Sequence, residues 1–152
     1  MINHFCKVPL WEASSTLAAV AQGRIPADVV IRNGTLVNVC THELLEAVDV
    51  GTQVIDATGT YIAPGFLDGH IHVESSMVSV GEYARAVIPH GTVGIFMDPH
   101  EICNVLGLKG VSCMVEDAKR TPLKAMITTP SCVPAVPGFE DTGSFVGPED
   151  IR

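Results

Sequence analysis

Histidines and carboxylates alternate along one short stretch of the chain, Asp68-Gly-His-Ile-His-Val-Glu74. Residues i and i+2 of a β-strand point to the same face, so a strand here places all four polar side chains on one side. Two imidazoles about 7 Å apart along a strand can converge on one metal ion. The alternative is a histidine pair on a half-exposed strand face, but four polar residues in an otherwise apolar run make a poor core. We therefore predict that His70 and His72 bind a metal ion.

Two serines follow where this strand would end. Parallel α/β sheets place their active sites at the carboxyl ends of the strands, which makes Ser75 and Ser76 candidates for contact with a substrate. The alternative is that Ser75, Ser76 or Ser79 caps the helix expected around Glu82. The two roles are compatible, and the sequence leaves both open.

A second polar cluster, Asp98-Pro-His-Glu101, closes another expected strand. Carboxylate and imidazole groups at a strand-to-helix junction can act as metal ligands or proton carriers. The alternative is an ordinary loop in which Asp98 caps a helix, with Pro99 and Glu101 at the first and third helical positions. Two such clusters, one βα unit apart, are more than capping requires. Adjacent strand ends would bring both clusters into one cleft.

The elements that must position these clusters follow a strand–helix alternation. Periodicity predicts a strand over Gly65 to Val73, a helix around Tyr83 to Ile88, a strand over Thr92 to Met97, a helix near Leu106 to Lys119 and a strand over Leu123 to Thr129. This order is typical of βα units on a parallel sheet. Uninterrupted apolar runs at 94–97 and 125–127 predict strands buried on both faces. A closed (β/α)8 barrel needs roughly 200 residues or more, so we expect a piece of something larger rather than a small open sheet.

The opening ~60 residues follow a different pattern, which predicts mostly small β-structure. A short helix is expected over Ser14 to Gln22, with serines at its start and a glycine stop at Gly23. Two β-branched runs flank Asn33-Gly34, which predicts a hairpin, because both central residues of a type I′ turn need a positive φ. A third strand is expected over Gln53 to Ala57.

Composition excludes several classes of protein. The 152 residues are 47% hydrophobic and 17% charged with a net charge of −8, which argues against disorder. An acidic chain without a Lys/Arg cluster predicts no nucleic-acid partner and no anionic-membrane partner. No apolar run is long enough to span a bilayer, and Met1 to Trp11 lack the apolar segment of a signal peptide.

The cysteines predict a reduced, cytoplasmic protein. They number five, an odd count without a C-x-x-C pair, which argues against a disulfide framework or a zinc ribbon. Cys132 follows the third strand of the parallel sheet and so faces the expected cleft, either as a reactive thiol or as a packing residue. No basic residue lies near it in the sequence, which favours packing.

Taken together, these motifs resemble a known family. Pro64-Gly-Phe-Leu-Asp-Gly-His-Ile-His72 resembles the first-strand signature of the amidohydrolase superfamily. The chain is similar to the bacterial and archaeal adenine deaminases in Val73-Glu-Ser-Ser-Met77, Pro89-His-Gly91, Asp98-Pro-His-Glu101, Asn104-Val-Leu-Gly107 and Pro130-Ser-Cys-Val-Pro-Ala135. The two motifs Glu-Ser-Ser-Met and Asp-Pro-His-Glu together are specific to far fewer proteins than His-x-His, which indicates only the superfamily. The resemblance runs from about Leu17 to Ile151 and covers the N-terminal part of the family.

The resemblance implies a fold, a reaction and a set of site residues. The fold would be a metal-dependent (β/α)8 TIM barrel, begun by residues 64–152, beside a small β-sandwich domain to which residues 1–63 contribute. The reaction would be hydrolytic deamination of adenine to hypoxanthine and ammonia, part of purine catabolism, at a binuclear manganese or iron centre. His70 and His72 would hold one ion. The implied catalytic residues, with roles not separated, are Glu74, Asp98, His100 and Glu101. Adenine would be the small-molecule partner, and assembly into a homo-oligomer stays open.

The sequence departs from the family pattern in two places. Only Val48 to Gln53 remains of a longer stretch that contributes strands to the small sheet, so we expect that sheet to be incomplete. The chain also stops at Arg152, ahead of the bridging carboxylate, the further histidines and the late-strand aspartate of the superfamily. Two other readings stay open: an amidohydrolase of cyclic amides, dihydroorotase-like or deacetylase-like, and a truncated non-catalytic module. The two narrow motifs weigh against the first, and the metal content of the natural polypeptide would decide the second.

Overall fold

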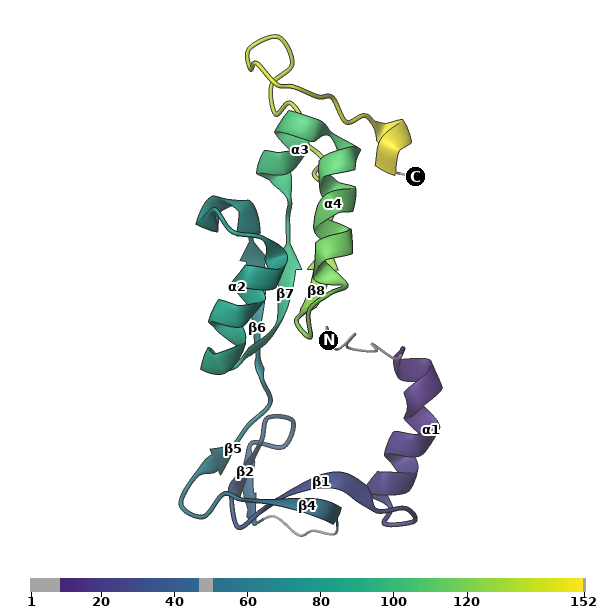
Figure 1. Ribbon diagram of the computed structural model, residues 1–152, viewed down its shortest axis with the longest axis vertical. Helices are drawn as coiled ribbons and strands as arrows, with labels where there is room; N and C mark the ends of the chain where they lie inside the picture. Colours follow the sequence, from purple (N-terminus) through teal and green to yellow (C-terminus); the bar gives the residue numbers. More distant parts are fainter. Residues whose placement is uncertain (1–8, 47–50, 152) are drawn as a thin grey trace. The chain divides into compact units, whose positions relative to one another are not determined.

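A computed structural model describes residues 9–46 and 51–151 of the chain (Figure 1). The chain divides after Pro64 into two compact units. Both contain parallel strand pairs, and helices alternate with strands in the second unit, so the predicted α/β class is confirmed. Within the described ranges, no helix is long and apolar enough to cross a membrane. The expectation for the shortened stretch Val48 to Gln53 falls partly on residues outside these ranges.

Helix α1, Leu10–Ala21, opens the first unit and begins earlier than predicted. Its N-cap residue is Pro9, which has no side-chain oxygen to accept a hydrogen bond. Ser14 lies inside the helix, where its hydroxyl donates to the carbonyl of Trp11 at 3.2 Å, so it is not the cap. The predicted glycine stop is confirmed, because Gly23 adopts a φ of 67°.

The five strands of the first unit form two small sheets. The strands are β1 Ala27–Arg32, β2 Thr35–Asn38, β3 Glu43–Glu46, β4 Gly51–Asp56 and β5 Tyr61–Ile62. Strand β1 pairs in parallel with β4. Strand β2 pairs antiparallel with β3 and parallel with β5. The predicted hairpin between β1 and β2 is therefore wrong, since these two strands belong to different sheets.

The Asn33-Gly34 pair has another role in this unit. Asn33 has a φ of 60°, and its side-chain amide donates to Asp56 Oδ1 at 3.1 Å, at the end of β4. Gly34 is not among the residues with positive φ, so the type I′ geometry is not formed. A Cβ at Gly34 would come within 3 Å of the Ile62 and Ala57 side chains. The pair thus carries the chain from one sheet to the other at a point of close approach.

The second unit contains the predicted βα units. Its three strands, β6 Phe66–Ile71, β7 Thr92–Met97 and β8 Lys124–Ile127, are parallel and lie in the order β6-β7-β8. Between β6 and β7 lie the 3₁₀ turn η1 Val73–Ser76, helix α2 Val80–Val87 and the 3₁₀ turn η2 Ile88–His90. Between β7 and β8 lie α3 His100–Leu106 and α4 Leu108–Ala118, and η3 Pro148–Ile151 comes last. A single helix was expected near α4, but Gly107, with φ 61° and ψ −150°, separates two.

The core of this unit lies between the sheet and its helices. Its larger cluster consists of Val73, Val80, Ala84, Ile95, Met97, Ala118 and Leu123. Ile95 and Met97 of β7 are fully buried, whereas Phe96 between them is 42% exposed. Leu67 of the neighbouring strand is 63% exposed. The expectation of strands buried on both faces is therefore wrong for the residues that the structure describes, because the helices cover one face.

An irregularity in β6 changes which residues share a face. Asp68 is aligned with Ile95, and Ile71 is aligned with Met97, so β6 has one more residue than β7 over this stretch. One extra residue reverses the alternation of side chains. Asp68 therefore falls on the side of the core residues, and its charge helps to raise the pKa of Tyr83 on α2, after burial as the main cause. The prediction that Asp68 shares a face with the two histidines is wrong.

Candidate metal centre

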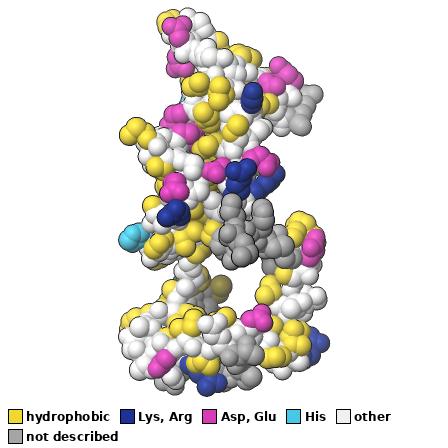
Figure 2. Space-filling view, in the orientation of Figure 1, with side chains coloured by type: hydrophobic (Ala, Val, Ile, Leu, Met, Phe, Trp, Pro, Cys, Tyr) yellow, Lys and Arg dark blue, Asp and Glu magenta, His cyan; other side chains and the backbone are white. Residues whose placement is uncertain are grey.

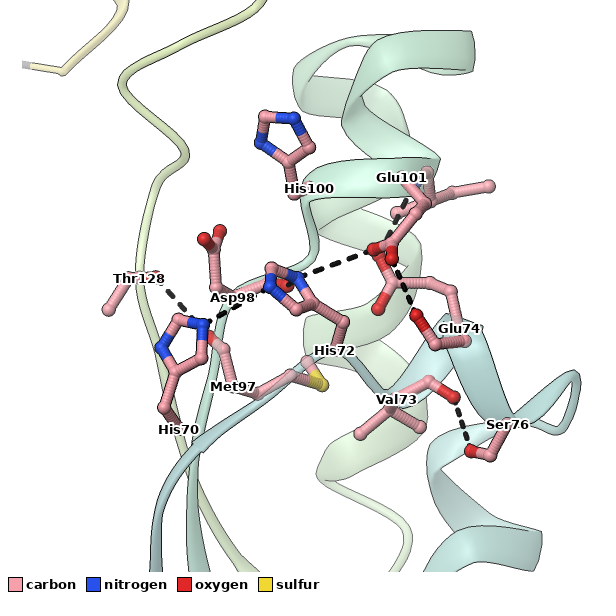
Figure 3. A network of polar contacts seen from close by, with 12 residues as sticks. His70, His72, Val73, Glu74, Ser76, Met97, Asp98, His100, Glu101 and Thr128 are labelled. Atoms are coloured by element: carbon pink, nitrogen blue, oxygen red, sulfur yellow. Dashed lines mark hydrogen bonds and ion pairs between the residues drawn. The ribbon is translucent and has the colours of Figure 1, made fainter.

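The two histidines of the His-x-His pair converge at the carboxyl end of β6. His70 is the next-to-last residue of the strand, and His72 follows it in an extended conformation as the N-cap of η1. Their Nε2 atoms lie 3.1 Å apart, and their rings are nearly perpendicular (Figure 3). Two nitrogens, each about 2.1 Å from one ion, would be roughly 3.0–3.4 Å apart. The pair therefore has the geometry of two ligands of a single ion.

The surroundings of His72 define which of its nitrogens carries the proton. Its Nδ1 lies 2.7 Å from the backbone carbonyl oxygen of Asp98 and 3.4 Å from Glu101 Oε2. A carbonyl and a carboxylate can only accept, so Nδ1 must be the donor. The Nε2 of a neutral His72 then keeps its lone pair, directed toward His70. This is the tautomer that a metal ligand requires.

Asp98 completes a group of three potential ligands. One ligand atom from each of His70, His72 and Asp98 lies within 4.8 Å of the others. The backbone N–H of Asp98 donates to Ile71 at 3.0 Å, which joins the ends of β6 and β7. Asp98 Oδ1 is buried without a hydrogen-bond partner. Leaving such an atom unpaired costs about 1–3 kcal/mol, and more when it is charged, so a cation at this point would satisfy it.

The capping role considered for Asp98 is not formed. The N-cap residue of α3 is Pro99, and no side-chain hydrogen bond is formed at this cap. Instead, Glu74 Oε1 accepts from the backbone N–H of Ile102 at 3.2 Å, one of the first-turn amides that a helix leaves unpaired. Glu74 Oε2 is buried without a partner. Glu74 therefore lies beside α3 rather than in line with the two histidines on β6.

Two of the remaining predicted residues, Ser75 and Glu101, form a hydrogen-bonded link between η1 and α3. Ser75 Oγ donates to Glu101 Oε1 at 2.6 Å. Burial raises the pKa of Glu101, but the Ser75 hydroxyl, a backbone N–H and the nearby histidines His72 and His100 together hold this pKa below its usual value. Ser76 Oγ donates within its own turn, to the carbonyl of Val73 at 2.5 Å. Ser79 caps α2 by accepting from Glu82, so that alternative is confirmed for Ser79 alone.

Two cysteines lie near the group, in contrasting settings. Cys132 is exposed, and its Sγ lies 3.5 Å from His100 Nδ1, so the packing interpretation of Cys132 is wrong. The His100 ring centre is 6.2 Å from that of His72, and His100 is not part of the group of three. Cys103 is fully buried, and burial, with the charges of Asp98 and Glu74, raises its pKa. Sequence reasoning missed the Cys132–His100 contact, although both residues follow neighbouring strands of one sheet.

Comparison of the sequence with known proteins identifies the family of the chain. The family described as "Amidohydrolase family" matches residues 61–151. The chain is 65% identical to a Clostridium botulinum (strain ATCC 19397 / Type A) protein named "Adenine deaminase", over 100% of this chain and 28% of the relative. A Moorella thermoacetica protein of the same name is 53% identical, over 94% and 27%. "Adenine deaminase 3" of Rhizobium meliloti is 44% identical, over 95% and 28%. The chain thus spans under a third of the length of these relatives.

Proposed function

The chain belongs to the amidohydrolase family, and on that premise we propose that the protein hydrolyses adenine to hypoxanthine and ammonia. Relatives at 44–65% identity carry the name adenine deaminase. This chain spans 28% of the length of such a relative. The observation that carries the proposal is the group of His70, His72 and Asp98 at the carboxyl end of two parallel strands, where α/β enzymes place their active sites.

The group would hold one ion of a binuclear manganese or iron centre. Two imidazole nitrogens and a carboxylate oxygen are ligands that both metals accept. The buried, unpartnered Oδ1 of Asp98 fits this role. A divalent ion bound there supplies Lewis acidity, which brings the pKa of a water molecule near neutrality. His70 and His72 would bind the ion through Nε2, and the Asp98 carbonyl would keep the His72 ring in its orientation.

The carboxylates and His100 are proposed to handle protons. Replacing the amino group of adenine by oxygen requires a proton at the departing nitrogen, which a positioned side chain can supply. Glu74 presents a buried oxygen, Oε2, that has no hydrogen-bond partner, and Asp98 has a second carboxylate oxygen besides the Oδ1 proposed for the ion. Glu101 and His100 lie at the start of α3, with Glu101 Oε2 3.4 Å from His72 Nδ1 and the His100 ring centre 6.2 Å from that of His72. Ser75 and Ser76 are proposed to contact the substrate through their oxygen lone pairs, since each hydroxyl proton is already donated.

The larger architecture is part of the same proposal. We assign residues 64–152 to the first βα units of a (β/α)8 barrel and residues 1–63 to part of a small β-sandwich. In support, β6, β7 and β8 are parallel and in chain order, with their helices on one face and apolar side chains such as Phe96 on the other. A cytoplasmic location is proposed because the four cysteines that the structure describes, Cys40, Cys103, Cys113 and Cys132, are all free thiols.

The test is a product assay on the protein expressed from its complete reading frame. After loading with manganese or iron, it should release ammonia from adenine and form hypoxanthine, and a chelated sample should not. A cyclic amide such as dihydroorotate, offered in parallel, should be left intact. Hydrolysis of the cyclic amide without ammonia release from adenine would overturn the proposal in favour of the other amidohydrolase activity.

A further inference from the structure

Three side chains form a continuous line from the surface to the metal group: Ser75, Glu101 and His72. The hydroxyl of Ser75 donates to Glu101 Oε1 at 2.6 Å, and Glu101 Oε2 lies 3.4 Å from His72 Nδ1. The line joins two elements that are separate in the chain, η1 and α3, since Ser75 and Glu101 are 26 residues apart. Figure 3 shows Glu101 lying between α3 and the ring of His72.

His72, the last residue of this line, must be oriented so that its Nε2 can bind the ion. A metal-ligating histidine binds through one nitrogen only when the other nitrogen keeps its proton, and an acceptor next to that proton fixes both the tautomer and the ring. His72 Nδ1 has two such acceptors, the carbonyl of Asp98 at 2.7 Å and the carboxylate of Glu101. The carbonyl is fixed by the backbone, whereas the carboxylate stands on a flexible side chain.

Glu101 needs a second contact to stay beside His72. Its side chain is 45% exposed, so without a partner its carboxylate would exchange among solvent-facing rotamers, which are favoured by entropy. The short hydrogen bond from Ser75 holds one carboxylate oxygen, which aims the other at His72 Nδ1. Ser75 thus reaches the metal group only through Glu101.

The neighbouring serine offers a contrast within the same turn. Ser76 donates to the carbonyl of Val73 in its own 3₁₀ turn, and no hydrogen bond described for it reaches α3 or His72. Two adjacent serines, equal in size and chemistry, therefore differ in one respect that bears on the ion. Ser75 is linked to a ligand of the proposed centre, and Ser76 is linked to its own backbone.

From these contacts we propose that Ser75 is a positioning residue for metal binding, which acts through Glu101 to hold the His72 imidazole. The proposal rests on the metal site of the proposed function and is independent of adenine as the substrate. It is compatible with a contact between Ser75 and a substrate, because the hydroxyl oxygen can still accept. Loss of such an outer partner of a ligating histidine typically weakens metal affinity about 10- to 100-fold.

The experiment measures metal affinity in the complete protein without substrate. Apo protein, its Ser75→Ala and Ser76→Ala variants and a Ser75→Thr variant are titrated with Co²⁺, followed by visible absorption. Ser75→Ala should weaken binding about 10- to 100-fold and alter the cobalt spectrum. Ser76→Ala should bind with an affinity within about twofold of the parent, and Ser75→Thr, which restores a hydroxyl, should recover most of the loss.

A double-mutant cycle separates positioning from a general structural effect. If Ser75 acts through Glu101, then Ser75→Ala should cause no further loss in a Glu101→Ala background. Full additivity of the two losses would overturn the proposal, as would equal losses for Ser75→Ala and Ser76→Ala. Cobalt binding as expected in a protein that releases no ammonia from adenine would refute the proposed function and support the positioning role.

Discussion

At the scale of single residues, the proposed metal group is distinguished by atoms that lack a protein partner. Asp98 Oδ1 is buried without a hydrogen bond, as is Oε2 of Glu74, which lies outside the group of three. The two Nε2 atoms of the histidine pair lie 3.1 Å apart. Buried polar atoms are nearly always paired in folded proteins. The unpaired, buried Oδ1 of Asp98, in the group with His70 and His72, therefore indicates a place where a cation supplies the missing interaction.

Removing the two imidazoles should remove the ion. In the complete protein, the double variant His70→Ala/His72→Ala is expected to lose most of its bound manganese or iron, because the group of three keeps only Asp98. Elemental analysis of the purified proteins gives the stoichiometry. His90→Ala, a change at an exposed histidine after α2, serves as the control and should retain the metal. An unchanged metal content in the double variant would refute the assignment of these ligands.

The cysteines near the group should differ in reactivity. Cys103 is fully buried, and burial raises its pKa, with the charges of Asp98 and Glu74 as further causes. The thiolate is the reactive form, so iodoacetamide should leave Cys103 unmodified in the folded protein while it alkylates the exposed Cys132. Peptide mass spectrometry reads each site, and both should react in denaturant. Equal labelling of the two thiols under native conditions would contradict this expectation.

At the scale of elements, sequence patterns predicted the positions of the parallel strands well, but they predicted strand pairing and side-chain faces poorly. The run from Thr92 to Met97 matches β7 at both ends, because a buried strand is marked by its own apolar residues. The hairpin at Asn33-Gly34 was wrong, because pairing depends on partners far along the chain, here β4 and β5. Asp68 was assigned to the wrong face, since one extra residue in β6 leaves no mark on the alternation of residue types.

The same reasoning separates the site residues that could be predicted from those that could not. The convergence of His70 and His72 follows from their spacing in a strand. The link from Ser75 to Glu101 and the contact of Cys132 with His100 join residues that are 26 and 32 positions apart. Only the strand order brings such residues to one edge of the sheet. The sequence indicated that these four residues follow strand ends, but it could not indicate which pairs of side chains would be in contact.

The turn that replaces the hairpin should give the first unit a pH-dependent stability. Hydrogen bonds from the Thr58 hydroxyl, the Asn33 amide and the Thr58 N–H lower the pKa of Asp56 below its usual value. A lowered pKa in the folded state contributes stability at pH values above the unfolded pKa of about 4, and that contribution disappears as the pH falls through the folded value.

Comparison with a neutral variant isolates this effect. Asp56→Asn should unfold at a lower temperature than the parent protein at about pH 6, and the difference should shrink toward about pH 3. Other carboxylates titrate in both proteins and cancel. Thermal unfolding followed by circular dichroism at several pH values measures the gap. A gap that stays constant over this range would show that the Asp56 charge makes no contribution.

At the scale of the whole molecule, apolar surface is left uncovered in both units. Figure 2 shows hydrophobic side chains at the surface among acidic and basic ones. In the second unit, Leu67 and Phe96 lie on the face of the sheet without helices, and they are 63% and 42% exposed. β8 is an edge strand of this sheet, with Ala125 to Ile127 along it. Uncovered apolar faces and open strand edges favour association with other chains.

The chain of 152 residues, expressed by itself, is therefore expected to aggregate or dimerise. It should also release no ammonia from adenine, because the potential ligands among its described residues come from two neighbouring strands and would reach one side of a metal pair. Size-exclusion chromatography and the loss of adenine absorbance after manganese loading test both points. A stable monomer with measurable turnover would contradict the expectation that these 152 residues lack part of the catalytic site.

The short reach of the metal group along the chain has a consequence for the order of folding. All three of its ligands lie between His70 and Asp98, and a single βα crossover separates β6 from β7. Closing this one crossover costs less loop-closure entropy than joining strands that are farther apart in the chain. We therefore expect the β6–β7 pair to form before more distant pairings, and an ion that binds the folded pair stabilises it by mass action. Refolding should accordingly be faster with manganese present than in a chelator, and equal rates would refute this. The ion would then take part in assembling the protein before it takes part in any reaction.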